Sequence, residues 1–231
     1  MSMKVSDAGA VNQAKNPNMQ KRMHKKILYI KCAESIIRNE GMSALNIRRI
    51  ATELGYNSAT LYNYFEDLEE LVLFATFKFR KEYLVRLSQE VLPSMSYLQQ
   101  YVKMYEIYCE YAFEEPEVYF NMYFGKYSNK LNAVRDAYYA MFPDEFVEQT
   151  PLVHAVTCGK DVYAGERAAM SMLVQEGVIK PENADMVARL VVRVHSSYMH
   201  DLCVYKHNSA TLCRYEFMDC LMHIIRTNSK E

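Results

Sequence analysis

The sequence is poor in residues that make tight turns, with 7 glycines and 6 prolines among 231 residues. A sandwich or barrel of many short strands needs more turn formers, so these classes are excluded. No apolar run approaches the roughly 18 residues that a membrane-spanning helix needs. The N-terminus lacks the apolar segment of a secretory signal. The six cysteines form no CxxC pair, and we expect reduced thiols in a cytoplasm.

Half of the residues are hydrophobic and 24% are charged, which is typical of one large or two small soluble globular domains and excludes a disordered chain. The net charge of −1 conceals an uneven distribution. Residues 1–65 hold 10 Lys and Arg against 4 Asp and Glu, whereas residues 66–231 hold 17 against 24. The resulting charges of +6 and −7 indicate that the N-terminal part meets a polyanion.

The hydrophobic pattern predicts an all-α protein. Residues 1–20 are polar and without a period, and we interpret them as a flexible arm. An apolar stripe with helical spacing follows from Lys21 to Gly41. The next helices are predicted over 47–54, capped by Asn46, from Ser58, and from about 67 to 92. Later helices are expected at 94–114, 116–124, 128–141, 152–178, 182–206 and 210–227.

Two short helices separated by about three residues, after a longer helix, outline a helix-turn-helix. Leu61 and Phe65 are spaced to anchor the third helix. The short polar side chains between and around them can reach base edges or phosphates. Basic residues at the start of the first helix, with Arg48 and Arg49 on the second, can neutralise phosphates. The outward polar residues of this segment are Asn57, Ser58, Thr60 and Asn63.

The segment from Gly41 to Phe65, with its LYNYF sequence and the following Glu69-Glu70-Leu71, resembles the DNA-binding segment of the tetracycline-repressor (TetR) family of bacterial transcription regulators. The resemblance covers roughly residues 21–80. It implies a DNA-binding domain over 21–80 that includes the start of the fourth helix, and a helical regulatory and dimerisation domain over 81–231. It further implies a homodimer, a palindromic operator and repression relieved by a small-molecule effector.

The resemblance and the pattern together predict which side chains meet DNA. Leu68 departs from the family, which commonly has a phosphate-binding lysine at this position, and it lies within an acidic stretch. This departure shifts the phosphate contacts toward the first two helices and the arm. The predicted DNA-binding residues are Lys25, Asn46, Arg48, Tyr56, Asn57, Ser58, Ala59, Thr60, Tyr62, Asn63 and Tyr64.

Aromatic residues are concentrated in residues 97–142, where 14 of 46 positions are Tyr or Phe. These rings can form an ordinary core with hydroxyls at its wet edge, or a pocket for a planar or apolar molecule. Tyr101, Tyr105 and Tyr108 share one helix face and are the predicted ligand-binding residues. We expect an aromatic or elongated apolar effector.

Other sequence features favour no further chemistry. His200, Cys203 and His207 share a helix face, but three such residues arise easily by chance, and we predict neither a metal site nor a cofactor. No Walker loop, GxSxG, HExxH or dinucleotide motif is present, and we predict no enzyme. The alternatives left open are a small-molecule carrier or enzyme with a vestigial helix-turn-helix, a ligand-free architectural DNA binder, and a helical corner in an unrelated all-α protein.

Overall fold

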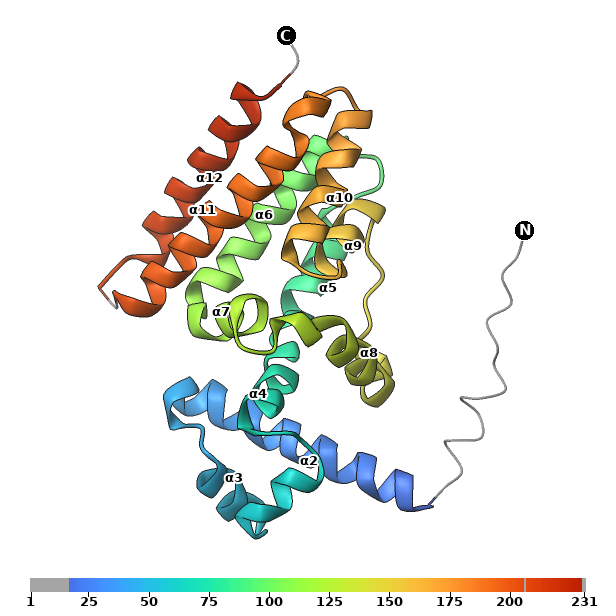
Figure 1. Cartoon of the computed structure of the whole chain (residues 1–231), viewed down its shortest axis with the longest axis vertical. Helices are drawn as coiled ribbons and strands as arrows, with labels where there is room; N and C mark the ends of the chain where they lie inside the picture. The colour runs from blue at the N-terminus through green and yellow to red at the C-terminus, as the bar shows by residue number, and fades with distance from the viewer. Residues whose placement is uncertain (1–16, 206, 230–231) are drawn as a thin grey trace, which may run out of the picture. The chain divides into compact units, whose positions relative to one another are not determined.

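The structure is a computed structural model that describes residues 17–205 and 207–229. Within these ranges the chain consists of helices joined by turns, and the one pairing of extended residues is an isolated bridge between Ile179 and Ser229. The all-α prediction is therefore confirmed (Figure 1). The chain divides between Ala75 and Thr76 into two compact units, which we call the small unit and the large unit.

The small unit is a group of short helices around one long helix. Its core contains apolar side chains from each helical segment except the first 3-10 turn, among them Ile30, Ile50, Leu61 and Phe74. The segments are α2 (Pro17–Glu40), the 3-10 turn η1 (Met42–Ala44), α3 (Ile47–Leu54), the 3-10 turn η2 (Ser58–Asn63) and most of α4 (Leu68–Phe77).

The long helix α2 begins earlier than its predicted start at Lys21, because Pro17 already occupies the first turn, where a proline is well tolerated. Of the predicted arm, residues 1–20, the first 16 residues lie outside the part of the chain that the structure describes. Residues 17–24 are exposed throughout. Consequently the predicted stripe is buried from Ile30 onward, whereas Met23 near its start is exposed.

Local capping explains where α3 begins and ends. The side-chain oxygen of Asn46 accepts a hydrogen bond from the Arg49 amide at 2.9 Å, which confirms the predicted N-cap. The helix ends at Gly55, whose φ of 66° lies in the left-handed region that favours glycine. This turn leads the chain directly into η2.

The large unit is a bundle in which α6, α10, α11 and α12 are the long helices and lie side by side (Figure 1). Helix α11 packs against α10, α12 and α7, and α6 packs against α12, α5 and α9. The helices are α5 (Arg80–Glu90), α6 (Tyr97–Glu114), α7 (Pro116–Phe124), α8 (Leu131–Met141), α9 (Pro151–Thr157), α10 (Val162–Gln175), α11 (Ala184–Val204) and α12 (Ala210–Thr227). Three 3-10 turns connect them, at Ser128–Lys130, Pro143–Glu145 and Pro181–Asn183.

Two of the predicted long helices are wrong, since the structure breaks each of them. The helix predicted over 67–92 is divided into α4 and α5 at Phe79, whose ring is buried and whose carbonyl oxygen accepts a hydrogen bond from the Tyr119 hydroxyl at 3.1 Å. The helix predicted over 152–178 is divided into α9 and α10, where Asp161 caps the second helix by accepting from the Ala164 amide at 2.8 Å. Both breaks depend on side-chain partners that a local period does not reveal.

Helices α9 and α10, into which the helix predicted over 152–178 is divided, pack very closely. A Cβ atom at Gly165 of α10 would lie 2.6 Å from the carbonyl oxygen of Val156 on α9. Only glycine permits this approach. The close packing places Glu166, the next residue of α10, beside α9 and against α6.

Candidate functional site

The helix-turn-helix of the small unit consists of α3, the turn at Gly55 to Asn57, and η2. Leu61 and Phe65 are 1% and 2% exposed, so they anchor η2 to the unit as predicted. The hydrogen bonds of η2 join residues three apart, as from the Thr60 amide to the Asn57 carbonyl at 2.9 Å. The predicted third helix is thus a tight 3-10 turn, which directs its polar side chains outward over a short length of chain.

The predicted DNA-binding residues of η2 form an accessible segment, Ser58 to Asn63, which we call the reading segment. Ala59, Tyr62 and Asn63 are exposed, and Ser58 and Thr60 are partly exposed. Tyr62 has 56% of its surface exposed, although it is a large aromatic residue. An aromatic ring kept on the surface in this position has no role in the core of the unit.

Two predicted contact residues also hold the backbone. Asn46 caps α3, and its Nδ2 donates to the Ala44 carbonyl at 3.3 Å. Asn57 caps η2, because its Oδ1 accepts from the Ala59 amide at 2.9 Å. These amides are therefore placed rigidly at the two helix starts, and a substitution of either changes the local backbone as well as the surface.

The structure brings the predicted residue Lys25 of α2 next to the reading segment. Its Nζ lies over the ring of Tyr56, 5.2 Å from the ring centroid. The Tyr56 and Tyr64 rings in turn pack on the buried ring of Tyr29, at 6.0 and 5.7 Å between centroids. Tyr56 and Tyr64 are thus half-buried supports for the surface rather than freely exposed groups.

The basic residues differ in how freely their charges face solvent. Arg48 is exposed, whereas Arg49 forms ion pairs with Glu40 at 2.8 Å and Glu53 at 3.1 Å. Burial lowers the pKa of Lys26, and its Nζ lies over the ring of Phe65 at 5.0 Å. The phosphate role expected of Arg49 therefore competes with two carboxylates.

The acidic stretch that contains Leu68 serves the start of α4. Asp67 accepts a hydrogen bond from the Glu70 amide at 2.9 Å, and Glu70 accepts one from the Glu66 amide at 2.6 Å. Negative charge at a helix N-terminus is favourable. This explains the departure from the expected lysine: the helix start is satisfied by the protein's own carboxylates.

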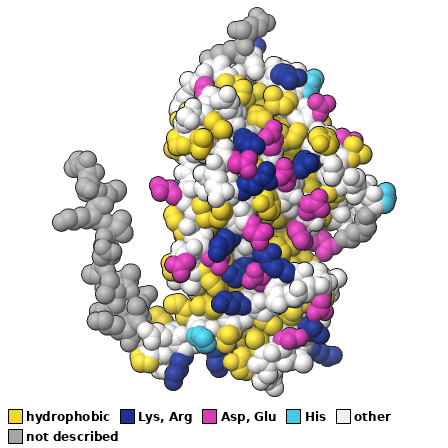
Figure 2. Space-filling model, turned by 180° about the vertical axis from the view of Figure 1, so that it is seen from behind, with side chains coloured by type: hydrophobic (Ala, Val, Ile, Leu, Met, Phe, Trp, Pro, Cys, Tyr) yellow, Lys and Arg dark blue, Asp and Glu magenta, His cyan; other side chains and the backbone are white. Residues whose placement is uncertain are grey.

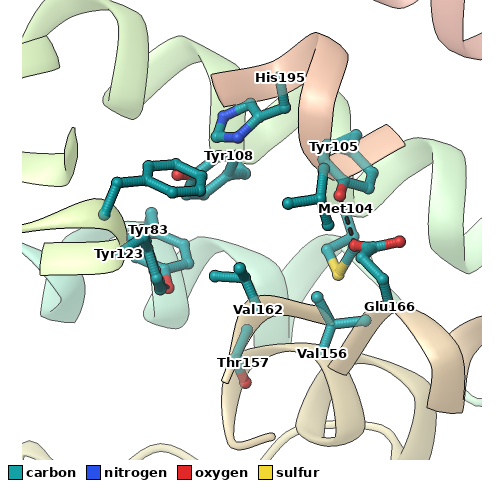
Figure 3. Close-up of a pocket in the computed structure, with 12 residues that line it drawn as sticks. Tyr83, Met104, Tyr105, Tyr108, Tyr123, Val156, Thr157, Val162, Glu166 and His195 are labelled. Carbon is teal, nitrogen blue, oxygen red and sulfur yellow. Dashed lines mark hydrogen bonds between the residues drawn. The ribbon is translucent and has the colours of Figure 1, made fainter. Parts of the chain in front are cut away.

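The large unit contains a cavity lined mostly by apolar and aromatic side chains, which we call the aromatic pocket (Figure 3). Its volume of about 60 Å³ corresponds to roughly four to six waters at 10–15 Å³ each. A larger molecule enters only if side chains in the wall move. The wall comprises Tyr83, Met104, Tyr105, Tyr108, Tyr123, Phe124, Val156, Thr157, Val162, Glu166, Val192 and His195.

One carboxyl group, Glu166, lies in this apolar wall and is 2% exposed. The Tyr101 hydroxyl donates to it at 2.6 Å, and the Tyr105 hydroxyl donates to its other oxygen. Burial raises the pKa of Glu166 to about 7, although the two phenol hydrogen bonds act in the opposite direction. The group therefore changes its charge near neutral pH.

The predicted ligand residues have different places around this carboxyl. Tyr105 and Tyr108 line the aromatic pocket, whereas Tyr101 is fully buried behind it and contacts Glu166. Figure 3 shows Tyr105 and Glu166 on one side of the cavity and Tyr83 and Tyr123 on the opposite side. The hydroxyls of Tyr83 and Tyr123 are 3.2 Å apart and within hydrogen-bond distance.

His195 is a second polar group of the wall that the sequence did not single out. Burial lowers its pKa to about 3, so the imidazole is neutral at neutral pH. Its ring stacks on Phe113, with centroids 6.0 Å apart, and its Nε2 is buried without a hydrogen-bond partner among the described residues. Glu166 was also missed, because an acidic residue within a helix is usually solvated and its burial depends on the neighbouring helices.

In residues 17–205 and 207–229, no group of three or more His, Cys, Asp or Glu side chains is arranged to hold a metal ion. No described helix is both long and apolar enough to cross a membrane. In Figure 2, acidic and basic side chains are interspersed over the visible face of the molecule.

Comparisons with known proteins agree with this geometry. Residues 30–74 match the family model of the bacterial regulatory proteins of the tetR family. A search of curated protein sequences gives no significant match.

Solved structures of similar fold cover nearly the whole chain. FadR of Thermus thermophilus, a TetR family transcriptional repressor in complex with lauroyl-CoA, has 12% identity over 87% of this chain and 93% of its own, with a TM-score of 0.56. RolR in complex with resorcinol has 12% identity over 92% and 96%, with a TM-score of 0.54. SmeT of Stenotrophomonas maltophilia, the repressor of a multidrug efflux pump, has 10% identity over 89% and 91%, with a TM-score of 0.51. At these identities the similarity establishes the fold.

The helix-turn-helix with its exposed reading segment and the helical bundle define a DNA-binding transcriptional regulator. Residues 30–74 carry the match to the tetR family of bacterial regulatory proteins, and the fold of the chain is that of solved tetR family regulators.

Proposed function

We propose that this regulator is a repressor that binds a palindromic operator as a homodimer and is released by a small apolar or aromatic effector. Residues 21–80 would bind the DNA, and residues 81–231 would bind the effector and form the dimer. The observation that carries the proposal is the occurrence of an exposed reading segment and of the aromatic pocket in two compact units of one chain. Because its target is a bacterial chromosome, we place the protein in the cytoplasm.

The proposal assigns no catalytic activity to the chain. The carboxyl of Glu166 is held by two phenol hydroxyls and the imidazole of His195 is neutral. Groups held in this way are suited to orient a bound molecule. Regulation then requires that the effector bind one of two conformations more tightly than the other. The small pocket volume supports this coupling, since a ligand must displace wall side chains to enter.

Exposed apolar side chains on the last two helices support a dimer. Met186 and Leu190 of α11, and Leu212 and Tyr215 of α12, have between 40% and 65% of their surface exposed. Their spacings of four and three residues place each pair on one helix face. A second copy of this chain would cover these faces, as a two-fold partner does for a palindromic operator.

Base reading and phosphate binding can be separated by two substitutions. Once an operator has been selected from random-sequence DNA, Asn63→Ala is expected to reduce discrimination by about 1–3 kcal/mol at one base position of each half-site. Lys25→Ala is expected to weaken all DNA sequences alike and to flatten the salt dependence. Fluorescence anisotropy on operator and random duplexes at several salt concentrations measures both effects.

Lys31→Ala, an exposed position on another face of α2, is the matched control for Lys25→Ala and should leave the salt slope unchanged. Equal losses on operator and random DNA for both Asn63→Ala and Lys25→Ala would contradict the assignment of the reading surface.

The effector pocket is tested by Tyr108→Ala, which enlarges the cavity without removing a hydrogen bond to Glu166. We expect the response of operator binding to hydrophobic ligands to fall from the 5- to 150-fold range typical of allosteric coupling to about 1-fold. Operator affinity without ligand should stay near that of the wild type. The measurement is an operator-binding titration with a library of aromatic and apolar compounds.

Tyr97→Ala, on the same helix but outside the pocket wall, controls for the loss of a tyrosine. If Tyr108→Ala responds to every active ligand as the wild type does, the aromatic residues form a core and the pocket assignment fails.

A further inference from the structure

Arg80, the first residue of α5, is a buried charged residue with an incomplete set of hydrogen bonds. It is 1% exposed. Its Nε donates to the Tyr83 hydroxyl at 3.2 Å, and its Nη2 donates to the Thr157 carbonyl at 2.8 Å. Its Nη1 is buried without a hydrogen-bond partner among the described residues. The N–H groups of Nη1 therefore lack a hydrogen-bond acceptor.

The positive charge of Arg80 also lacks a carboxylate among the described residues, since all of its hydrogen bonds go to neutral oxygens. Burial opposes the charged form, but the neighbouring Tyr83, Tyr123 and Tyr139 outweigh it and raise the pKa of Arg80 well above its ordinary value. The guanidinium thus keeps its proton. A buried charge without a counter-charge is costly, and the cost disappears when an anion binds.

Arg80 lines a second cavity of the large unit, which we call the polar cavity and which has a volume of about 440 Å³. This space is several times larger than the aromatic pocket and is sufficient for a small organic molecule. Its wall also contains Tyr139 and Phe146, which offer rings to an apolar portion of a ligand.

The other charged residues of the wall leave the charge of Arg80 unbalanced. Arg135 contacts Asp136 through Nε and Nη2, both at 3.0 Å, and donates from Nη1 to the Cys158 carbonyl at 2.8 Å. Arg135 and Asp136 therefore neutralise each other. His154 is the remaining titratable side chain with a basic group in the wall. No carboxylate of the wall is thus free to pair with Arg80.

A second unsatisfied atom indicates more about the ligand. Gln149 lines the same cavity, and its Nε2 donates to the Leu84 carbonyl at 2.7 Å, which fixes the orientation of the amide. Its Oε1 is buried and has no donor among the described residues. The wall of the polar cavity thus combines a charged donor that needs an acceptor with an amide oxygen that needs a donor. Both atoms are buried within the wall, so a ligand in the cavity reaches them only when neighbouring side chains of the wall move.

We propose that the polar cavity binds a small organic acid, whose carboxylate accepts a hydrogen bond from Nη1 of Arg80 and whose hydroxyl or N–H group donates to Oε1 of Gln149. This site is distinct from the aromatic pocket and goes beyond the proposed function. The two are connected, because Arg80 contacts Tyr83, Tyr83 contacts Tyr123, and Thr157 lines both cavities. Arg80 also follows directly after the break between α4 and α5, so the acid would bind at the start of the bundle.

The test is isothermal titration calorimetry of the full-length protein, without DNA, using benzoate, 3-hydroxybenzoate and 4-hydroxybenzoate as probes. We expect all three acids to bind. The hydroxybenzoate isomer whose hydroxyl reaches Gln149 should bind more tightly than benzoate. The corresponding hydroxybenzamides, which lack the negative charge, should bind about 30- to 100-fold more weakly. Arg80→Met should weaken the acids by a similar factor and leave the amides nearly unchanged.

Gln149→Met provides an independent variant that keeps the charge of Arg80. This variant should still bind benzoate but lose the preference for a hydroxybenzoate over benzoate. If Arg80→Met does not fold, Gln149→Met alone tests whether the acid binds in the polar cavity. Arg167→Met, at an exposed arginine of α10 outside the cavity, should change nothing. Absence of acid binding to the wild type, equal binding of acids and amides, or an unchanged hydroxyl preference in Gln149→Met would overturn the proposal. Because no operator is used, this result is independent of whether the protein is a repressor.

Discussion

Replacing Leu190 and Tyr215 together by glutamate is expected to convert the proposed dimer into monomers that bind operator DNA about 100- to 10,000-fold more weakly. Leu190 is 40% exposed on α11 and Tyr215 is 65% exposed on α12. In a dimer through these helices, each glutamate would place an unpaired carboxylate in an apolar contact, which is costly. Two linked reading units bind a palindrome far more tightly than one, and this advantage disappears with the dimer.

Sedimentation at micromolar concentration and binding to whole operators and half-sites measure this result. Leu92→Glu is the matched control, because Leu92 is an exposed leucine outside α11 and α12. The control should stay dimeric and bind as the wild type does. A double variant that sediments as a monomer and still binds the whole operator with wild-type affinity would exclude the proposed dimer as the basis of operator binding.

The proposed dimer could also be tested by truncating the chain before Pro181, but surface substitutions are the better test. Removal of the last two helices would also remove Val191, Met199 and Phe217, which are at most 1% exposed in the core of the large unit. Such a truncated chain would lose affinity because it unfolds, whatever its oligomeric state.

Glu166→Gln is expected to make the protein more stable at pH 8 and to change its stability little at pH 5. In the folded protein the pKa of Glu166 is about 7, against an ordinary value of 4.5. A group with a raised folded pKa contributes stability that is present below the unfolded pKa and is lost as the pH rises through the folded pKa. The shift corresponds to about 3 kcal/mol between pH 4.5 and pH values above 7.

Urea unfolding of the wild type and of Glu166→Gln between pH 5 and pH 8 measures this difference. The free energy of unfolding of the wild type should fall relative to that of the variant by about 3 kcal/mol over this range. Glu216→Gln, at an exposed glutamate of α12, controls for the general effect of removing a carboxyl group. Parallel pH profiles for the wild type and Glu166→Gln would mean that the buried carboxyl stays ionised throughout.

The structure of the small unit was largely predictable from the sequence, because the residues that determine it lie close together in the chain. Asn46 is a side-chain cap three residues from the amide that donates to it, Gly55 has the positive φ that ends a helix, and Leu61 and Phe65 are one turn apart. The exposure of Asn63 follows from the same short spacing. The tertiary structure added the ion pair of Arg49 with Glu40 and the contact of Lys25 with Tyr56, which join different segments of the unit.

The helical bundle was predicted as a class but not in its details. A hydrophobic period continues through Phe79, and only the hydroxyl of Tyr119, 40 residues away, identifies the carbonyl at which the helix is broken. The aromatic concentration in 97–142 supplies part of the wall of the aromatic pocket, and the rest comes from other segments. It did not distinguish Tyr105 and Tyr108, which line the cavity, from Tyr101, which lies behind it on the same helix.

By itself the sequence determined the helical class, the helix-turn-helix with its caps and anchors, and the resemblance of this segment to the tetR family, since each depends on residues within a few positions of one another. Only the tertiary structure decided which polar groups are buried. Glu166 lies against Tyr101 and Tyr105, and Arg80 lies against Tyr83 and Thr157, through contacts between different helices. Whether such a charge is solvated or enclosed depends on how the helices pack, and this packing determines the ligand chemistry of the large unit.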